Sequence, residues 1–286
     1  SSCRKRNCFD RYGRWFIFCD LLYSGFMSIK NDIVIQANAL TCAYGTSVIL
    51  DNINFEVRRG EVFIILGGSG CGKSTLLKHL IGLYQPAEGS IKIIDQDLVH
   101  ANQQEHRRIL NNIGVMYLSG ALFGSMSLLE NVRLPLEEHT TLGNHAMNLI
   151  AHMKLSLVGL GNFTKHYPSE VSGGMQKRAA IARAMALDPE VLFLDEPSAG
   201  LDPITSSELD ALIRRLAESL GITFVIVSHE LASIFAIADR VIMLDAETKG
   251  IIADGPPVTL QQSHSNATVR EFFNRGKLNN ITQLKD

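Results

Sequence analysis

Long apolar runs, paired cysteines and an excess of one charge are all missing from this 286-residue sequence. No stretch approaches the ~18 consecutive apolar residues that cross a bilayer, so any work at a membrane requires a partner protein. The 27 basic and 29 acidic residues leave no positive excess to attract nucleic acid. The five cysteines show neither disulfide nor zinc-type spacing, which indicates a reducing cytosol. We find no internal repeat and no low-complexity tract.

The first 26 residues differ in composition from the rest, with three of the five cysteines and the aromatic run Arg14–Phe18. A basic start followed by apolar residues is similar to a signal peptide, but Asp20 interrupts the apolar stretch. A membrane-surface helix is one alternative. We expect instead an upstream extension ahead of a start at Met27, and we treat residues 1–30 as a poorly ordered N-terminal extension.

Short apolar runs alternate with helical patterns over most of the remaining chain. Runs that are apolar throughout are expected of strands buried on both faces, and period-two alternation predicts half-buried strands. Strand–helix–strand alternation favours a mostly parallel sheet covered by helices. The predicted strands are Ile33–Ile35, Ile53–Val57, Val62–Leu66, Ile113–Tyr117, Val191–Leu194 and Phe224–Val227, and the predicted helices include Lys73–Leu83 and Ile204–Leu220.

A glycine-rich loop in the pattern G-x-x-x-x-G-K-[ST] lies between a predicted strand and a predicted helix. Its glycines allow backbone N–H groups to converge on phosphate oxygens, and the helix N-terminus adds positive potential. Lys73 would place its charge on the β- and γ-phosphates, and the Ser74 hydroxyl would ligate magnesium. A merely flexible loop would explain neither residue. The predicted nucleotide-binding residues here are Gly67, Gly68, Ser69, Gly70, Cys71, Gly72, Lys73, Ser74 and Thr75.

Asp195 and Glu196 follow the apolar run at 191–194. Beside a phosphate loop, Asp195 suits a carboxylate that holds magnesium together with Ser74, directly or through water. Glu196 would orient and deprotonate the attacking water. Taken alone, an apolar run ending in two acids is commonplace, and the loop and the acids together still fit kinases and GTPases.

The stretch Val171–Arg178 separates these classes, because it resembles the L-S-G-G-Q signature of the ATP-binding-cassette family, with its basic, alanine-rich helix. Val171 and Met175 depart from the signature at its flanks only. The central residues would present N–H donors at a helix start to a second face of a γ-phosphate, although alone they would be an ordinary helix cap. The predicted signature contacts are Ser172, Gly173 and Gly174.

Other motifs follow in the family's order. Ser198–Asp202 resembles the D-loop that links the two sites of the dimer, and Asp202 is a predicted nucleotide contact. His229 resembles the switch histidine that contacts the γ-phosphate, and Tyr44 resembles the aromatic that stacks on adenine. Outside the family, a lone histidine at a strand end is usually structural, and a tyrosine in a turn is commonplace. The predicted catalytic residues are Glu196, His229 and Lys73.

One position departs from the family, which places a glutamine at the end of the strand 113–117, where it touches magnesium and the attacking water. Here the position is Leu118, whose side chain cannot ligate a metal or hold water. We hypothesise that catalysis persists but is slower or differently coupled. The hypothesis is wrong if Leu118→Gln leaves the ATPase rate and its coupling unchanged in the assembled transporter.

The resemblance covers residues 31 to about 275 and implies an α/β fold of the P-loop NTPase type. This fold has a mostly parallel sheet with flanking helices, an antiparallel β edge and an inserted α-helical subdomain. In the family, two subunits pair head to tail as a homodimer, and each ATP, with Mg²⁺, lies between one phosphate loop and the other subunit's signature. The implied divisions are a RecA-like nucleotide-binding core at 31–118 and 188–258, a helical subdomain at 119–187 and a tail at 259–286.

Several short segments resemble one branch, the MlaF-type ATPases of the lipid-asymmetry (toluene-tolerance) phospholipid transporters of Gram-negative bacteria. That branch implies a location on the cytoplasmic face of the inner membrane and a C-terminal tail that reaches the other ATPase subunit. The implied partners are a permease (MlaE-like), a lipid-binding protein of the mammalian-cell-entry type (MlaD-like) and a small STAS-domain protein (MlaB-like). The segments are Ser119–Phe123, Glu130–Val132, Pro135–Leu136, Glu138–Thr140, Ser172–Met175, Gly200–Thr205 and Val269–Phe273.

Three alternatives remain open from the sequence. An importer of amino acids or other small polar solutes would share every motor motif. A cassette ATPase of DNA repair would need a long internal coiled coil, and one of translation would need two tandem cassettes; the sequence shows neither. A catalytically weak regulatory cassette is suggested only by Leu118.

Overall fold

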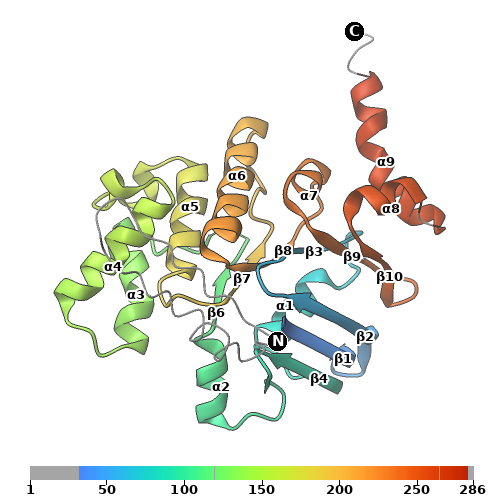
Figure 1. Cartoon of the computed structure of the whole chain (residues 1–286), viewed down its shortest axis with the longest axis horizontal. Coiled ribbons are helices and arrows are strands. Elements are labelled where there is room, and N and C mark those ends of the chain that lie inside the picture. Colours follow the sequence, from blue (N-terminus) through green and yellow to red (C-terminus); the bar gives the residue numbers. More distant parts are fainter. Residues whose placement is uncertain (1–31, 119, 264, 283–286) are drawn as a thin grey trace, which may run out of the picture. The chain divides into compact units, whose positions relative to one another are not determined.

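The computed structural model describes residues 32–282 except 119 and 264, and the residues from Ile33 onward form one compact unit. The predicted N-terminal extension therefore lies outside the described residues, as does Ser119. Figure 1 shows two sheets with helices around them. None of the helices in the described part of the chain is both long and apolar enough to span a bilayer.

The first sheet is antiparallel and has the strand order β2-β1-β4-β5. It is a separate sheet of four strands. Its strands are β1 (Ile33–Tyr44), β2 (Ser47–Arg58), β4 (Glu88–Ile93) and β5 (Gln96–Asp97).

Strands β1 and β2 are both much longer than the sequence predicts. The pairing of β1 with β2 shifts register at several points, including between Ala37 and Leu40. Ala39 and Asn52 have positive φ, and the Asn54 side chain accepts a hydrogen bond from the N–H of Ala39 at 2.7 Å. Such bulges interrupt the period-two alternation on which strand prediction depends. Tyr44, predicted in a turn, is the last residue of β1.

The second sheet has the order β10-β9-β3-β8-β7-β6, and all of its pairings are parallel except that of β10 with β9. The parallel core and its crossover helix confirm the predicted fold class. The strands are β3 (Val62–Gly67), β6 (Ile113–Met116), β7 (Val191–Asp195), β8 (Thr223–Val227), β9 (Arg240–Asp245) and β10 (Gly250–Gly255).

Alternate residues of the second sheet enter two different hydrophobic clusters. In β3, Ile64 and Leu66 face the cluster formed with helices α3 to α6, whereas Phe63 and Ile65 face the cluster formed with α1 and the first sheet. Both faces of the sheet are therefore buried, as the continuous apolar runs predict. The helices here are α1 (Lys73–Leu80), α3 (Leu128–His139), α4 (Asn144–Leu157), α5 (Gly173–Ala184) and α6 (Pro203–Leu220).

Helices fill the region between β6 and β7, where α3 packs on α4 and α5 and α5 also contacts β6 (Figure 1). Asn131, fully buried in α3, fixes the turn before this helix, because its side chain bonds the backbone of Phe123 and the carbonyl oxygens of Met126 and Ser127. The remaining helices are α2 (Gln103–Leu110), α7 (Leu231–Ile237), α8 (Pro257–Ser263) and α9 (Ala267–Thr282), with short 3-10 turns at Gly161–Phe163 and Pro168–Glu170.

Candidate nucleotide site

The phosphate loop leaves the carboxyl end of β3, and its backbone requires glycine. Gly67, Gly70 and Gly72 have φ values of 152°, 77° and 100°. A Cβ added at Gly67 would lie 2.5 Å from the carbonyl oxygen of Leu244, so any side chain there would collide with β9. Gly72 is the N-cap of α1 and provides no side-chain cap, which leaves the first N–H groups of the helix free for an anion.

Lys73 turns back over this loop. Its Nζ donates hydrogen bonds to the carbonyl oxygens of Gly67 at 3.0 Å and Gly68 at 2.9 Å, so the ammonium is held against the concave backbone. Ser74 is exposed at the start of α1. Cys71 points into the core, where burial raises the pKa of its thiol. Cys71 therefore offers the site its backbone N–H and not its sulfur.

Asp195 ends β7 and lies in the electrostatic field of the phosphate loop. Burial raises the pKa of Asp195 and the charge of Glu196 raises it further, while Lys78, Lys177 and Lys73 oppose the shift. Because β3, β8 and β7 are parallel neighbours, the phosphate loop and Asp195 both lie at the carboxyl edge of the sheet, although they are more than a hundred residues apart in the sequence.

Glu196 stands in an unusual backbone conformation with a φ of 47°. Its N–H donates to the carbonyl oxygen of Val227 at 2.9 Å, and its Oε1 lies 2.8 Å from Nδ1 of His229. His229 itself is exposed. The structure thus pairs two of the predicted catalytic residues directly, and a non-glycine residue in the left-handed region is typical of a functional position.

The predicted signature residues begin helix α5. Ser172 is the N-cap, and its Oγ accepts a hydrogen bond from the N–H of Met175 at 3.3 Å. Gly173 is exposed, and a Cβ there would meet only Leu201 at 3.7 Å. Gly174 is buried, and a Cβ there would lie 2.3 Å from Cγ2 of Thr205 in α6. Gly174 is therefore required for the contact between two helices.

Asp202 has a structural role that the sequence did not show. Its carboxylate caps α6, with Oδ1 accepting from the N–H groups of Ile204 and Thr205 at 3.1 Å and Oδ2 from the hydroxyl of Thr205 at 2.5 Å. The Thr205 hydroxyl, followed by the backbone N–H groups, lowers the pKa of Asp202. This carboxylate is thus occupied by its own helix.

Tyr44 lies at the surface with its ring 43% exposed and in edge-to-face contact with Tyr84, the ring centroids 5.5 Å apart. Tyr84 in turn lies under the Nζ of Lys78, which is 5.6 Å from the ring centroid. An exposed aromatic ring is suited to stacking, but the contact with Tyr84, in the segment after α1, was not predicted.

Two lysines near the carboxylates were missed by the sequence analysis. Lys78 lies four residues after Ser74, one helical turn away, and that spacing could have identified it. Lys177 lies on α5 and bonds the carbonyl oxygen of Leu118. Lys177 is buried whereas the adjacent Arg178 is only partly buried, and the sequence of this basic stretch does not indicate the difference.

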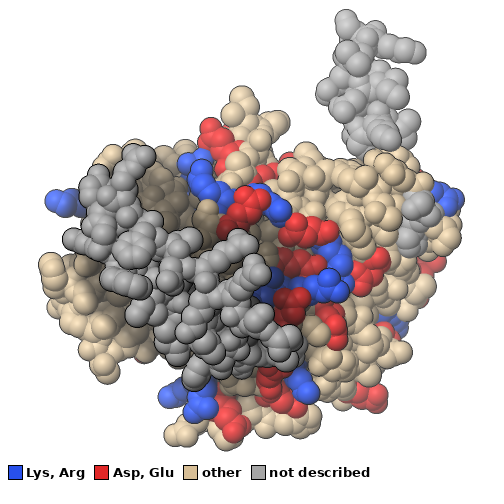
Figure 2. Space-filling view, in the orientation of Figure 1, with Lys and Arg blue, Asp and Glu red and all other residues tan. Residues whose placement is uncertain are grey.

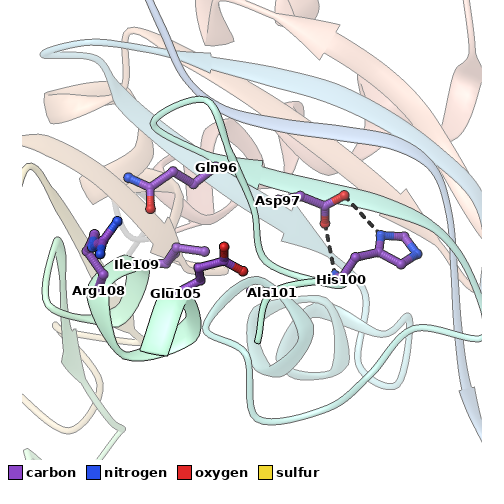
Figure 3. A pocket seen from close by; sticks show the side chains of 7 residues that line it. All are labelled: Gln96, Asp97, His100, Ala101, Glu105, Arg108 and Ile109. Atoms are coloured by element: carbon purple, nitrogen blue, oxygen red, sulfur yellow. Dashed lines mark hydrogen bonds and ion pairs between the residues drawn. The ribbon is translucent and has the colours of Figure 1, made fainter. Parts of the chain in front are cut away.

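A separate pocket of about 320 Å³ lies between the turn after β5 and helix α2 (Figure 3). On one side Nδ1 of His100 lies 2.9 Å from Oδ2 of Asp97, and Arg108 stands on the other. Burial acts to raise the pKa of Asp97, but hydrogen bonds from His100 and the backbone outweigh it and lower that pKa. The pocket contains none of the predicted site residues. It is lined by Gln96, Asp97, His100, Ala101, Glu105, Arg108 and Ile109.

The face shown in Figure 2 carries acidic and basic side chains side by side and not in a patch of one sign. This distribution agrees with the balanced composition of 27 basic and 29 acidic residues.

Known proteins resemble this chain over most of its length. The family profile described as ABC transporter matches residues 50–199. The intermembrane phospholipid transport system ATP-binding protein MlaF of Haemophilus influenzae is 39% identical over 255 residues, which cover 89% of this chain and 95% of that protein. The probable ribonucleotide transport ATP-binding protein mkl of Mycobacterium tuberculosis is also 39% identical, over 249 residues that cover 87% of this chain and 68% of that protein.

A solved structure agrees with these relatives. A dimeric ATP-binding cassette in a post-hydrolysis state, bound to ADP and Pi, is 29% identical with a TM-score of 0.69, covering 78% of this chain and 98% of that one. The family match, the shared fold and the joined phosphate loop and carboxylates all agree. The chain belongs to the ABC transporter family, and it is an ATP-binding ATPase of that family.

Proposed function

We propose that this ATPase is the motor subunit of a transporter that moves phospholipid between the inner and outer membranes of a Gram-negative bacterium. One observation carries the proposal. Two relatives share the same 39% identity with this chain, but the match spans 95% of the phospholipid transport protein and only 68% of the ribonucleotide transport protein. The phospholipid transport protein is thus matched almost from end to end, whereas about a third of the ribonucleotide transport protein has no counterpart in the match.

The site residues support hydrolysis within this proposal. Lys73 and the uncapped start of α1 would bind the phosphates, and Tyr44 would stack on the base. Glu196, whose side chain is 15% exposed and is held by His229, would take the proton of the attacking water. His229 would then be placed to sense the γ-phosphate. Thr75 and the remaining loop residues contribute N–H groups at the same helix start.

Magnesium would be held by the Ser74 hydroxyl and the Asp195 carboxylate. Both are hard oxygen donors, the class that Mg²⁺ prefers, and water and phosphate oxygens commonly complete such a site. Within the described residues, no three His, Cys, Asp or Glu side chains gather as a metal-binding group, so the ion would depend on the nucleotide for much of its binding. Bound Mg²⁺ would neutralise negative charge on the phosphates.

We propose further that two copies act together at the cytoplasmic face of the inner membrane. Gly173 is exposed at the start of α5, and a phosphate from a second subunit could approach it without meeting a side chain. The permease (MlaE-like), the mammalian-cell-entry protein (MlaD-like) and the STAS-domain protein (MlaB-like) would complete the assembly. Closure of the two copies on ATP, and reopening after hydrolysis, would drive the permease.

The proposal is tested by purifying the full chain with its partners from detergent-solubilised membranes and identifying the proteins and lipids by mass spectrometry. We expect a mammalian-cell-entry protein and bound phospholipid. A periplasmic amino-acid receptor, or a complex that contains no phospholipid, would contradict the assignment of cargo.

A second experiment links cargo to catalysis. The purified complex is placed in vesicles, and transfer of a fluorescent phospholipid is followed with and without ATP. Glu196→Gln should bind ATP, accumulate as a closed dimer and abolish transfer, since the water loses its base. Glu218→Gln, in an exposed ion pair with Arg214, is the matched control and should transfer lipid normally. Normal hydrolysis by Glu196→Gln would remove that residue from the mechanism.

A further inference from the structure

Lys177 is a buried cation in the helix that begins with the signature residues. It lies four residues after Gly173, one turn along α5, and is 8% exposed. Its Nζ donates a hydrogen bond to the carbonyl oxygen of Leu118 in the loop after β6. Because a buried ammonium is costly unless it is well partnered, this contact is a specific one.

The loop that Lys177 holds leaves the sheet beside the catalytic carboxylates. β6 pairs in parallel with β7, and Met116 lies opposite Leu194, so Leu118 and Asp195 emerge at the same edge. The Leu118 side chain is apolar and 51% exposed. Leu118 can therefore make a polar link only through its backbone, and its carbonyl oxygen is the group that Lys177 contacts.

The charge of Lys177 also acts on the carboxylates. Burial lowers the pKa of the Lys177 ammonium, and the charges of Asp195 and Glu196 oppose that shift. The effect of Asp195 and Glu196 on Lys177 is coulombic, and the hydrogen bond that Lys177 makes is to the carbonyl oxygen of Leu118.

We propose that Lys177 is a positioning residue for ATP hydrolysis: its ammonium fixes the loop at Leu118 to α5 and holds positive charge beside Asp195 and Glu196. One cation would then connect the helix that begins at the signature, the loop after β6 and the catalytic acids. A shift of α5 on closure would move that charge relative to Glu196. This inference rests on the proposed role of Glu196 in hydrolysis.

Arg183 provides a matched control on the same helix. Its guanidinium donates to the carbonyl oxygens of Gly120 at 2.9 Å and Ala121 at 2.7 Å, so it anchors the same loop two residues further on. Burial alone lowers the pKa of Arg183, and neither carboxylate contributes. Arg183 thus anchors the same loop as Lys177, but Asp195 and Glu196 are not among the groups that shift its pKa.

The test compares Lys177→Met, Lys177→Arg and Arg183→Met in the full chain, purified with the membrane proteins that accompany it. For Lys177→Met we expect kcat for ATP to fall by about tenfold or more while KM stays within about twofold, because the proposed role of Lys177 concerns the catalytic acids and the loop beside them and not nucleotide binding. Lys177→Arg should restore most of kcat, and Arg183→Met should lose several times less. Thermal melts of all three check folding.

Three outcomes would overturn the inference: a wild-type kcat in Lys177→Met, an equal loss in Arg183→Met, or no recovery in Lys177→Arg when its melting temperature is that of the wild type. These outcomes differ from failure of the proposed function. If the wild-type complex hydrolyses no ATP, the motor role fails; if it hydrolyses ATP but the three variants behave alike, only the role of Lys177 fails.

Discussion

Two helices of this protein begin with glycine-rich segments, and they are built in different ways. Before α1, three glycines have positive φ and the N-cap Gly72 has no capping side chain. Before α5, neither Gly173 nor Gly174 has positive φ, and the Ser172 side chain caps the helix. Glycine thus shapes the backbone at the first helix and makes room for other atoms at the second.

The difference explains why one segment is a complete anion site and the other is not. The phosphate loop has its own cation, since Lys73 lies over the carbonyl oxygens of Gly67 and Gly68. Among the described residues, no lysine is hydrogen-bonded over the signature segment in this way, and Lys177, one turn later, points to Leu118. We therefore propose that the second segment binds phosphate only when another subunit brings the nucleotide to it.

The largest effect that this comparison predicts is from Lys73→Met. Losing a charge-assisted contact to phosphate should weaken ATP binding by about 10- to 100-fold and reduce turnover at least as much. Binding of a fluorescent ATP analogue and phosphate release measure the two effects. Lys92→Met, at an exposed position on β4, is the control and should match the wild type. If Lys73→Met binds ATP normally, the first segment is not the anion site.

The next largest effect is expected from Gly173→Asp, which places a carboxylate at the exposed start of α5. It should leave ATP binding by the isolated chain unchanged and reduce turnover by about tenfold or more, because phosphate would meet a like charge there.

Mixing this variant with Lys73→Met sharpens the comparison. Each mixed dimer would contain one site with an intact phosphate loop and an intact signature, so phosphate release should exceed that of either variant alone. Turnover by Gly173→Asp at the wild-type rate, or no recovery on mixing, would break the proposed division between the two segments.

The sequence was sufficient to predict the parallel strands on either side of the site. Val62–Leu66 and Val191–Leu194 are apolar throughout because both faces of those strands are buried, and the pattern therefore survives in the sequence. In β1, the positive φ of Ala39 and the shifts of register interrupt the alternation. The first sheet was therefore predicted too short.

The site residues show the same limit. Lys73 and Glu196 belong to motifs that can be recognised in the sequence. The contact of Gly174 with Thr205 joins two helices, and the capping role of Asp202 joins residues within one turn. Neither contact follows from the periodic pattern of apolar residues. Neither the pairing of Glu196 with His229 nor the positive φ of Glu196 was indicated by the sequence.

A smaller effect, on stability, should come from Gly174→Ala. The new methyl group would lie 2.3 Å from Cγ2 of Thr205, and such overpacking typically costs about 1–3 kcal/mol. For a chain of this size the melting temperature should fall by roughly 2–10 °C. Thr205→Ser removes the obstructing methyl and keeps the hydroxyl that bonds Asp202, so the double variant should recover most of the loss. If it does not, the glycine is there for another reason.

The smallest effect concerns the cap of α6, whose Thr205 packs on Gly174. The hydrogen bond from the Thr205 hydroxyl, with those from the backbone, lowers the pKa of Asp202. A carboxyl whose pKa is lower in the folded state stabilises the fold above its unfolded pKa of about 3.9 and loses that contribution as pH falls through the folded value.

Asn is nearly as good an N-cap as Asp but carries no charge. The melting temperature of Asp202→Asn should therefore lie slightly below that of the wild type at pH 7, and the gap should begin to narrow below about pH 4 and close as the pH falls through the lower pKa of the folded state. Salt should narrow the gap at pH 7, since the carboxylate is exposed. A gap that does not narrow as the pH falls below about 4 would show that shape, and not charge, makes Asp202 the cap of this helix.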